Sequence, residues 1–259
     1  NKTTGIGSVL QTNRQPYNGQ VPDFQIADKE KLVIYEMLVR DFTEEHTYKA
    51  VLENLDYLED LRINVLELMP VNEFEGNSSW GYNPSFYFTP DKYYGPANEL
   101  KMLIDECHKR GIAVVIDMVL NHSYGQSPFV QMYMDNWTIT PENPWYNVKS
   151  NFQNPSAQWG YDFNHENAAT RELVDSVASF WMSEYKIDGF RFDFTKGFSN
   201  TPYPADSWGS NYDAARIANL KRMTSEIWKR NKDAIVIFEH LSDNSEETEL
   251  ANYGIFLWG

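Results

Sequence analysis

The sequence contains little cysteine, few basic residues and no long apolar run. Its single cysteine, Cys107, excludes both an internal disulfide and a cysteine-rich zinc site. The chain has only 22 lysines and arginines against 37 aspartates and glutamates, which gives a formal net charge of −15. This charge would repel phosphate backbones and anionic lipid heads. No stretch reaches the roughly 18 apolar residues that a bilayer span requires. We therefore expect neither a nucleic-acid partner nor a membrane span.

The remaining composition is that of a globular protein. The chain has 259 residues, 42% of them hydrophobic, which suffices for one large barrel or sandwich domain or for two smaller domains. Aromatic residues make up 15% of the chain and include 8 tryptophans and 16 tyrosines. Many of these rings must belong to the core, but such a supply also suits a cleft in which flat ligand faces stack on rings.

Short apolar runs alternate with longer amphipathic stretches along most of the chain. This alternation predicts repeated strand–helix units and therefore a parallel sheet. Most of the predicted strands are too apolar to face water on either side. The six predicted strands are residues 32–40, 63–71, 112–120, 187–195, 234–241 and 254–258.

Four amphipathic stretches between these strands predict helices that pack on the core. They are marked by Thr47 with Val51, Leu55 and Leu58; by the frame from Pro96 to Gly111; by Leu173, Val174, Val177, Phe180 and Trp181; and by Ile217, Leu220, Thr224 and Ile227.

Two segments depart from this alternation. Residues 1–30 are rich in Asn, Gln, Gly and Thr, which predicts a linker or the tail of an upstream domain. Residues 121–165 carry four prolines and several aromatics where a helix would otherwise follow the third strand. We interpret 121–165 as a small inserted subdomain, because barrel enzymes build their sites from long structured loops after strands. The barrel itself is expected over 31–259.

Polar residues interrupt the apolar runs near the ends of three strands. In a parallel barrel all strands end on one face, so these side chains are expected to converge there. Burying them without a function would be costly. They are Asp117, Asn121 and His122 after the third strand, Arg191 and Asp193 in the fourth, and Glu239 and His240 in the fifth.

Two of these carboxylates have different surroundings. Arg191 and Asp193 lie two residues apart, on the same side of their strand, so the guanidinium should keep Asp193 ionised and able to act as a nucleophile. Partial burial of Glu239 would raise its pKa toward that of a general acid. Taken singly, a strand-end aspartate is more often a cap or an ion-pair partner. Together the two carboxylates meet the requirement of a glycoside hydrolase.

Several motifs carry a family resemblance. The segments DMVLNH (Asp117–His122) and GFRFDFTK (Gly189–Lys196), followed by Glu239 at the end of the fifth strand, resemble three motifs of the α-amylase family in family order. The resemblance spans roughly residues 32–258. Further matching markers are YEMLVRDF (Tyr35–Phe42), WGYNP (Trp80–Pro84), YYG (Tyr93–Gly95) and YDFNHEN (Tyr161–Asn167).

The resemblance implies a TIM-type (β/α)8 barrel, incomplete in this chain, with a small inserted subdomain after strand three. It also implies retaining cleavage of α-glucosidic bonds, chiefly α-1,4, in starch-like or glycogen-like glucans. By this resemblance Asp193 attacks the anomeric carbon, and Glu239 serves first as acid and then as base. Arg191 holds the nucleophile ionised.

Other positions receive roles from the same resemblance. Tyr82 would stack under the cleaved sugar, His122 would donate a hydrogen bond to it, and Asp117 would orient Arg191. Lys196 would touch the leaving-group side, and His240 would also contact substrate. Asn121 and Asp162 match positions that bind calcium in many relatives, and oxygen ligands suit that ion.

The chain also departs from the family pattern. Gly197 stands where many relatives have histidine, and Phe238 rather than glycine precedes Glu239. The family's third carboxylate, an aspartate after strand seven, has no counterpart here. A half-closed barrel would expose strand edges, so we expect a fragment whose parent continues for roughly another hundred residues or more and supplies that aspartate.

Three alternatives remain at this level. An α-glucan transglycosylase would use the same machinery, and a non-catalytic glucan-binding relative would account for the missing carboxylate. An unrelated phosphate-binding barrel would need a glycine-rich loop near a helix start, which is absent. Localisation is not encoded in the residues themselves, and the inferred activity favours the extracellular space or cell envelope over the cytoplasm.

Overall fold

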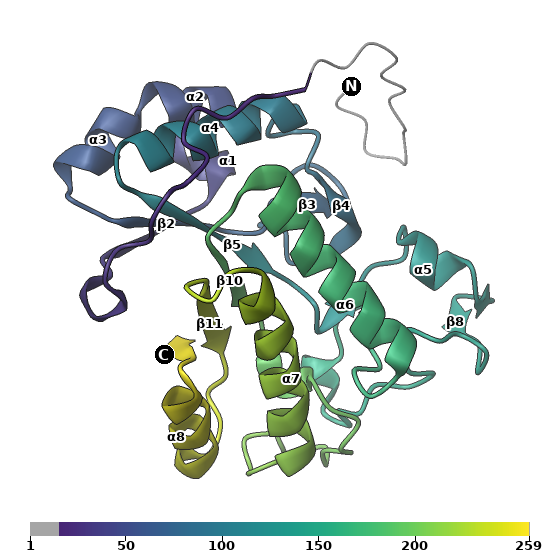
Figure 1. Cartoon of the computed structure of the whole chain (residues 1–259). Coiled ribbons are helices and arrows are strands. Elements are labelled where there is room, and N and C mark those ends of the chain that lie inside the picture. The colour runs from purple at the N-terminus through teal and green to yellow at the C-terminus, as the bar shows by residue number, and fades with distance from the viewer. Residues whose placement is uncertain (1–15, 259) are drawn as a thin grey trace.

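A computed structural model describes residues 16–258, and a six-stranded parallel sheet forms its centre (Figure 1). Each strand lies within one of the six predicted segments, so all six predictions are confirmed. Strand order across the sheet follows chain order, as in the first part of a barrel, and β1 and β12 do not pair with each other. The strands are β1 (Ile34–Met37), β2 (Val65–Leu68), β5 (Ala113–Met118), β10 (Gly189–Phe192), β11 (Ile235–Glu239) and β12 (Phe256–Trp258).

The predicted amphipathic stretches are helical, although the first is broken at Asn54 into two helices. Thr47 caps the first of them, with its Oγ1 accepting a hydrogen bond from the Ala50 N–H at 3.2 Å. Within residues 16–258 no helix is long and apolar enough to cross a membrane. The helices are α1 (Val39–Phe42), α2 (Tyr48–Glu53), α3 (Leu55–Asp60), α4 (Ala97–Lys109), α5 (Pro128–Gln131), α6 (Ala168–Phe180), α7 (Ala214–Arg230) and α8 (Asn244–Tyr253).

Helix α8 escaped prediction because its sequence is acidic and lacks an apolar stripe. Leu250 is its only fully buried apolar side chain, and the helix begins instead with a cap, in which the Asp243 side chain accepts from Ser245 N–H. Short 3₁₀ turns cover Lys29–Lys31, Pro155–Ala157 and Thr195–Gly197.

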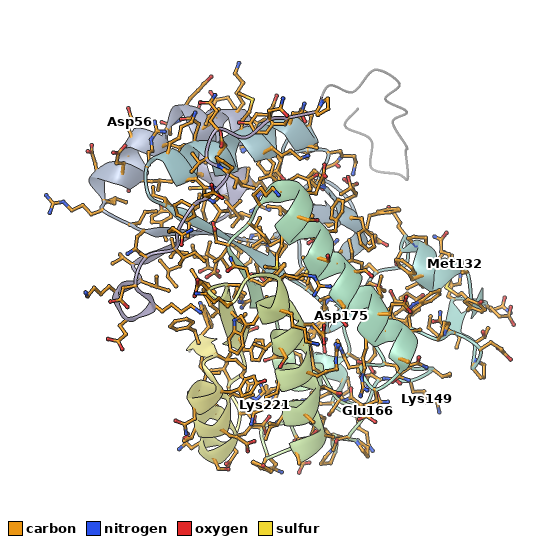
Figure 2. All side chains as sticks on the ribbon, viewed as in Figure 1. Asp56, Met132, Lys149, Glu166, Asp175 and Lys221 are labelled. Atoms are coloured by element: carbon orange, nitrogen blue, oxygen red, sulfur yellow. The ribbon has the colours of Figure 1, made fainter. Side chains whose placement is uncertain are left out.

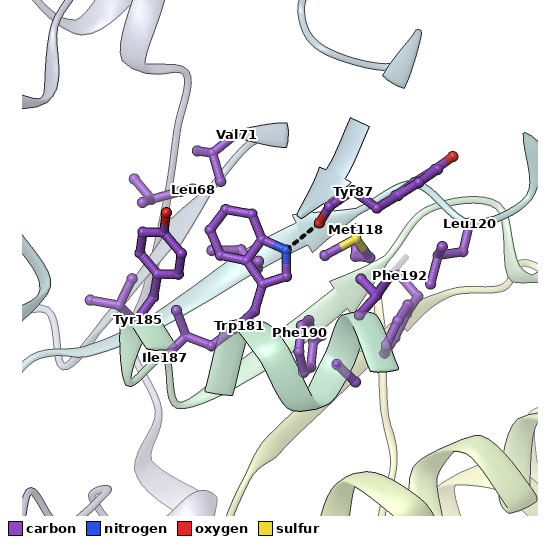
Figure 3. Packing of buried hydrophobic residues seen from close by; sticks show 14 of the residues in the cluster. Leu68, Val71, Tyr87, Met118, Leu120, Trp181, Tyr185, Ile187, Phe190 and Phe192 are labelled. Carbon is purple, nitrogen blue, oxygen red and sulfur yellow. Dashed lines mark hydrogen bonds between the residues drawn. The ribbon is translucent and has the colours of Figure 1, made fainter. Parts of the chain in front are cut away.

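A wide turn extends α6 and fastens it to the rest of the core. Residues Trp181–Tyr185 form a π-helical turn that ends where Lys186 takes a left-handed conformation, with φ 61°. The fully buried Trp181 indole donates a hydrogen bond to the Tyr87 carbonyl at 2.8 Å (Figure 3). This bond satisfies the indole N–H inside an apolar cluster and joins α6 to β4 (Pro84–Pro90).

The opposite face of the sheet has its own core. Alternate residues of the strands form a separate apolar cluster below the strand ends. Phe24, Ile26 and Leu32 pack against it from the N-terminal segment. The cluster comprises Val65, Ala113, Val115, Ile235 and Ile237.

Part of the predicted linker therefore contacts the barrel. Tyr17 donates a hydrogen bond to Asp105 at 2.9 Å, and the Phe24 ring stacks on His108 with centroids 4.1 Å apart. Residues 1–15 of the predicted 1–30 linker lie outside the described residues. A connection to an upstream domain stays a prediction.

Three small antiparallel pairs lie outside the main sheet: β3 (Asn72–Phe74) with β4, β6 (His122–Ser123) with β9 (Tyr161–Asp162), and β7 (Met134–Asp135) with β8 (Thr138–Ile139). The segment 121–165 contains the last two pairs and α5. That this segment is a separate subdomain stays a prediction. Figure 2 shows Lys149 of this segment and Asp56 of α3 on the outside of the molecule.

One buried carboxyl group lies on strand β2. Glu67 of β2 is 1% exposed, its Oε1 has no hydrogen-bond partner in the described structure, and it lies directly opposite Glu36 of β1. Burial raises the pKa of Glu67 to about 7.

The raised pKa of Glu67 predicts that the free energy of unfolding depends on pH. The folded protein keeps a proton that the unfolded chain releases near pH 4.5, so Glu67 should reduce stability as pH rises from about 4.5 to 7. We expect Glu67→Gln to remove roughly 1–3 kcal/mol of that loss. Urea unfolding of the wild type and of Glu67→Gln at pH 4.5 and pH 7.5 measures the free energy of unfolding of each. A difference between the two proteins that is the same at both pH values would contradict the assignment.

Candidate active site

Arg191 lies at the carboxyl edge of the sheet, where it contacts three carboxylates. Its Nη1 donates to both Asp117 oxygens at 2.9 and 2.8 Å and to Asp193 Oδ1 at 3.1 Å. Its Nη2 lies 3.2 Å from Glu239 Oε2. Strand register explains the meeting, because Arg191 of β10 pairs with Asp117 of β5 on one side and Ile237 of β11 on the other. The predicted convergence of Asp117, Arg191, Asp193 and Glu239 is therefore present in the structure.

Backbone groups fix the two proposed catalytic carboxylates. The Phe194 N–H donates to Glu239 Oε2 at 3.0 Å, and the Asp193 N–H donates to the Met118 carbonyl at 3.2 Å. Phe194 adopts a left-handed conformation, φ 42°, which is unusual for an aromatic residue. The side chains of Asp193 and Glu239 stay 15% and 24% exposed, so both are reachable from outside.

At Asp193, burial acts against the expected effect of Arg191. Arg191 was expected to keep Asp193 ionised, but burial raises the pKa of Asp193 to about 7, with the Arg191 charge opposing the rise and Glu239 adding to it. Burial is the largest cause, and the single guanidinium that opposes it is shared among three carboxylates.

A cleft of about 500 Å³ opens over these groups. Tyr82 lies in it, and its hydroxyl donates to Asp117 Oδ2 at 2.9 Å, which links the ring to the Arg191 cluster. Its stacking under a sugar stays a prediction. The cleft is lined by Ser79, Tyr82, Asn83, His122, Tyr124, Trp159, Asp193, Phe194 and Glu239.

His122 also lines the cleft, but both of its nitrogens have protein partners. Nε2 lies 2.9 Å from the Tyr82 carbonyl, so it must carry the proton, and Nδ1 accepts from the Asn121 side chain at 3.0 Å. Burial lowers the pKa of His122 to about 4, so the ring is neutral. A hydrogen bond from His122 to sugar stays a prediction and would require the ring to exchange its present partner.

Lys196 and His240 lie beside the cleft rather than in its lining. The Lys196 ammonium donates to Ser210 Oγ at 3.2 Å and lies 5.6 Å from the centre of the Phe194 ring. His240 is fully buried, with Nδ1 2.8 Å from Thr195 Oγ1 and Nε2 2.8 Å from Glu246 Oε1. The expected substrate contact of His240 has no support in this geometry, because the ring is enclosed and both nitrogens are engaged.

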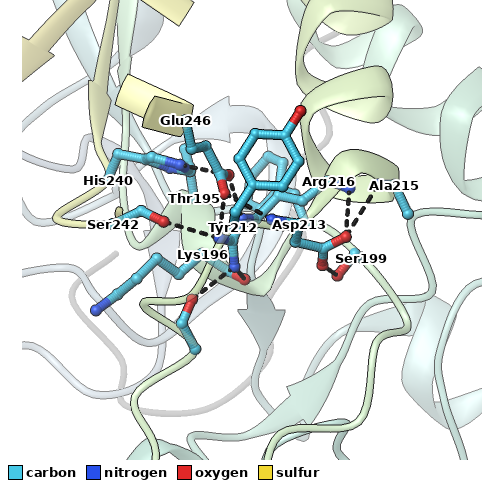
Figure 4. A network of polar contacts seen from close by, with 12 residues as sticks. Thr195, Lys196, Ser199, Tyr212, Asp213, Ala215, Arg216, His240, Ser242 and Glu246 are labelled. Carbon is cyan, nitrogen blue, oxygen red and sulfur yellow. Dashed lines mark hydrogen bonds and ion pairs between the residues drawn. The ribbon is translucent and has the colours of Figure 1, made fainter. Parts of the chain in front are cut away.

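A buried ion pair lies behind His240 (Figure 4). Arg216 of α7 and Glu246 of α8 are both 0% exposed, and they meet through Nε–Oε1 and Nη2–Oε2 contacts of 2.7 and 2.8 Å. Arg216 also donates to the Lys196 carbonyl at 3.2 Å. Through His240 and Thr195, whose hydroxyl lies 2.9 Å from the Glu239 carbonyl, the pair supports the loops that carry the site.

The residues predicted to bind calcium lie close together. Phe163, next to Asp162, donates its N–H to the Asn121 carbonyl at 3.1 Å. Asn121 Oδ1 is buried without a hydrogen-bond partner in the described structure, whereas Asp162 Oδ2 accepts from Asn147 at 2.8 Å. Across residues 16–258 no cluster of three or more His, Cys, Asp or Glu side chains could hold a metal. Asn121 and Asp162 thus offer oxygen donors with a single carboxylate.

Comparison with known proteins identifies the family. The family model described as "Alpha amylase, catalytic domain" matches residues 40–254. The chain belongs to this family.

Individual relatives share part of their length with it. A malto-oligosyltrehalose trehalohydrolase of Saccharolobus solfataricus is 31% identical over 66% of this chain and 30% of its own length. A 1,4-alpha-glucan branching enzyme, GlgB, of Leifsonia xyli is 31% identical over 80% of this chain and 28% of its own. The structure of Eubacterium rectale Amy13B superposes with a TM-score of 0.65 at 25% identity, covering 86% of this chain and 46% of that one. The chain thus spans about a third or less of these curated relatives.

Membership in the α-amylase family implies a TIM barrel, and the parallel half-barrel seen here is consistent with an incomplete one. Sequence reasoning missed Tyr124, Trp159 and Phe194 in the cleft, and Trp258, whose ring centre lies 5.4 Å from the Arg191 guanidinium. Trp258 could have been found, because it is the last residue of a predicted strand. The role of the Phe194 backbone N–H leaves no signal in residue types.

The buried pair Arg216–Glu246 predicts a large stability effect. Replacing Arg216 with Met should cost roughly 3–5 kcal/mol, because it leaves the buried Glu246 charge uncompensated. Urea unfolding is the measurement. Lys221→Met on the same helix is the matched control: its partner Glu249 is 40% exposed, and its loss should cost at most about 1 kcal/mol. Similar losses in the two variants would refute the special role of the buried pair.

Proposed function

We propose that the protein containing this chain is a retaining glycoside hydrolase that cleaves α-glucosidic bonds, chiefly α-1,4, in starch-like or glycogen-like glucans. The observation that carries the proposal is the meeting of Asp193 and Glu239 on one guanidinium, at 3.1 and 3.2 Å, inside an aromatic-lined cleft. Family membership supports it.

The two carboxylates would divide the chemistry. Asp193 Oδ attacks the anomeric carbon and forms a glycosyl–enzyme bond, while Glu239 gives its proton to the departing glycosidic oxygen. Glu239 then takes a proton from water, whose oxygen displaces Asp193 and restores the original anomeric configuration. This mechanism requires carboxyl groups about 5 Å apart, and their common contact with Arg191 supports a close approach.

Arg191 and Tyr82 would prepare the nucleophile. Arg191 holds Asp193 through Nη1 and is itself held by Asp117, which also accepts from Tyr82. Tyr82 thus couples the cleft wall to the charged cluster, in addition to its proposed stacking under the sugar. The third carboxylate expected for this chemistry would come from further barrel strands of a longer protein, and the isolated 259-residue chain is expected to be inactive.

The same residues would serve a transglycosylase, in which a sugar hydroxyl replaces water in the second step. The similarity to a 1,4-alpha-glucan branching enzyme over 80% of this chain keeps that alternative open. A non-catalytic glucan-binding role is less well supported, because such a protein has no need to hold Asp193, Arg191 and Glu239 in mutual contact.

The assignment predicts the effect of removing the nucleophile. We expect Asp193→Asn in the full-length protein to reduce activity by roughly 10⁴-fold or more on starch, glycogen or pullulan, because no carboxylate remains to attack. Release of reducing ends measures the loss. Asp175→Asn is the control, since Asp175 of α6 pairs with Arg222 of α7 at 2.7 Å, does not line the cleft and should not affect activity.

The products separate the alternatives. New reducing ends that accumulate with time support hydrolysis, whereas chain rearrangement without new reducing ends supports transglycosylation. Full activity in Asp193→Asn would overturn the nucleophile assignment. A wild-type protein that binds these glucans without changing them would favour the non-catalytic class.

Calcium remains part of this proposal. Asn121 Oδ1 and Asp162 would contribute two of the six to eight oxygen ligands such an ion takes, and the ion would support the base of the 121–165 segment. If calcium binds there, chelation should lower the melting temperature by several degrees, and added calcium should restore it. Asp162→Asn should abolish that response. A chelator effect that persists in Asp162→Asn would place the ion elsewhere.

A further inference from the structure

The aromatic lining of the cleft continues beyond it. Trp159 is half-buried in the cleft wall, with its ring centre 6.0 Å from His122 and 4.9 Å from the perpendicular Phe194 ring. The next ring outward is Trp208, whose centre lies 6.3 Å from that of Trp159 at an interplanar angle of 33°. Trp208 is 44% exposed. Two large rings therefore lead from the reacting groups toward solvent.

The backbone around Trp208 is held rigidly although its indole is exposed. Arg216 donates to the Gly209 carbonyl at 2.8 Å and to the Asn211 carbonyl at 3.0 Å. Gly209 has φ +66°, and a Cβ added there would lie 3.0 Å from the Phe152 ring, so this close approach favours glycine. A single exposed tryptophan is common. One that precedes a backbone segment held by a buried arginine, and that continues the aromatic lining of a cleft, is positioned to receive a ligand.

The position of Trp159 and Trp208 relative to Glu239 indicates which side of the cleft they border. Phe194 contacts Trp159 edge-on, and its N–H binds Glu239 Oε2. Lys196 lies against the same Phe194 ring and donates to Ser210, two residues beyond Trp208. The general acid must reach the glycosidic oxygen of the departing unit. The rings therefore flank the side on which that unit leaves.

We propose that Trp159 and Trp208 form an aromatic subsite that binds glucose units of an α-glucan on the leaving-group side of the cleft. This inference rests on the proposed function. Flat apolar rings suit the C–H faces of sugars, and a rigid platform lowers the ordering cost of binding a flexible chain. Longer substrates would gain from Trp208, whereas a substrate with a small leaving group would not reach it.

The test uses the full-length protein and two substrates. Maltoheptaose can extend over both rings, and an aryl α-maltoside carries only a phenol on the leaving side. We expect Trp208→Ala to lower the ratio of kcat/KM for maltoheptaose to that for the aryl maltoside by about tenfold, equivalent to one lost stacking contact. Trp208→Phe, which keeps a ring, should recover most of the ratio.

A matched control is available in the chain. Trp137 at the β7–β8 turn is 77% exposed, and Trp137→Ala should leave the ratio unchanged. An unchanged ratio in Trp208→Ala, whether activity on both substrates stays the same or falls equally, would overturn the subsite while leaving the proposed hydrolase intact. Wild-type protein that is inactive on both substrates would instead count against the proposed function.

Discussion

The buried guanidinium of Arg191 is the constraint on which the rest of the structure depends. A cation that is 3% exposed costs several kcal/mol unless anions surround it, and here Asp117, Asp193 and Glu239 do so from three adjacent strands. That arrangement exists only in one register of β5, β10 and β11, because a one-residue slip would turn each side chain to the helical face. Compensation of the Arg191 charge therefore requires this strand register, and the register in turn places the carboxylates around Arg191.

A second buried arginine extends this order to the loops. Arg216 joins α7, α8 and the backbone that follows Trp208 through a set of hydrogen bonds that no apolar residue could replace. It shares no carboxylate with Arg191, so the two cations organise separate layers. One holds the reacting groups at the strand ends, and the other holds the loops that border the cleft. The short link between them runs from Glu246 through His240 and Thr195 to Glu239.

The strands and the charged cluster could be predicted because both leave a local trace. Strands buried on both faces appear as continuous apolar runs, and a polar residue that interrupts such a run stands out, as Arg191 does. Other features depend on contacts that residue types do not reveal. The sequence predicts a substrate contact for His240, and nothing in it reveals that the ring is buried against Glu246. Similarly, an arginine lies two residues before Asp193 in sequence, but the direction of the pKa shift follows chiefly from burial, which the sequence does not reveal.

The open side of the sheet bears on how the site works. Trp258, 41% exposed, covers part of Arg191 from β12, and Ile34 on the interior face of β1 is 40% exposed. Further strands of the kind that the barrel fold implies would cover both and reduce the access of water to Asp193 and Glu239, whose side chains are 15% and 24% exposed. Lower polarity would strengthen every contact that Arg191 makes. It would also increase the cost of holding three carboxylates around one guanidinium. The electrostatic surroundings of Asp193, the proposed nucleophile, would therefore depend on the complete barrel as well as on its nearest neighbours.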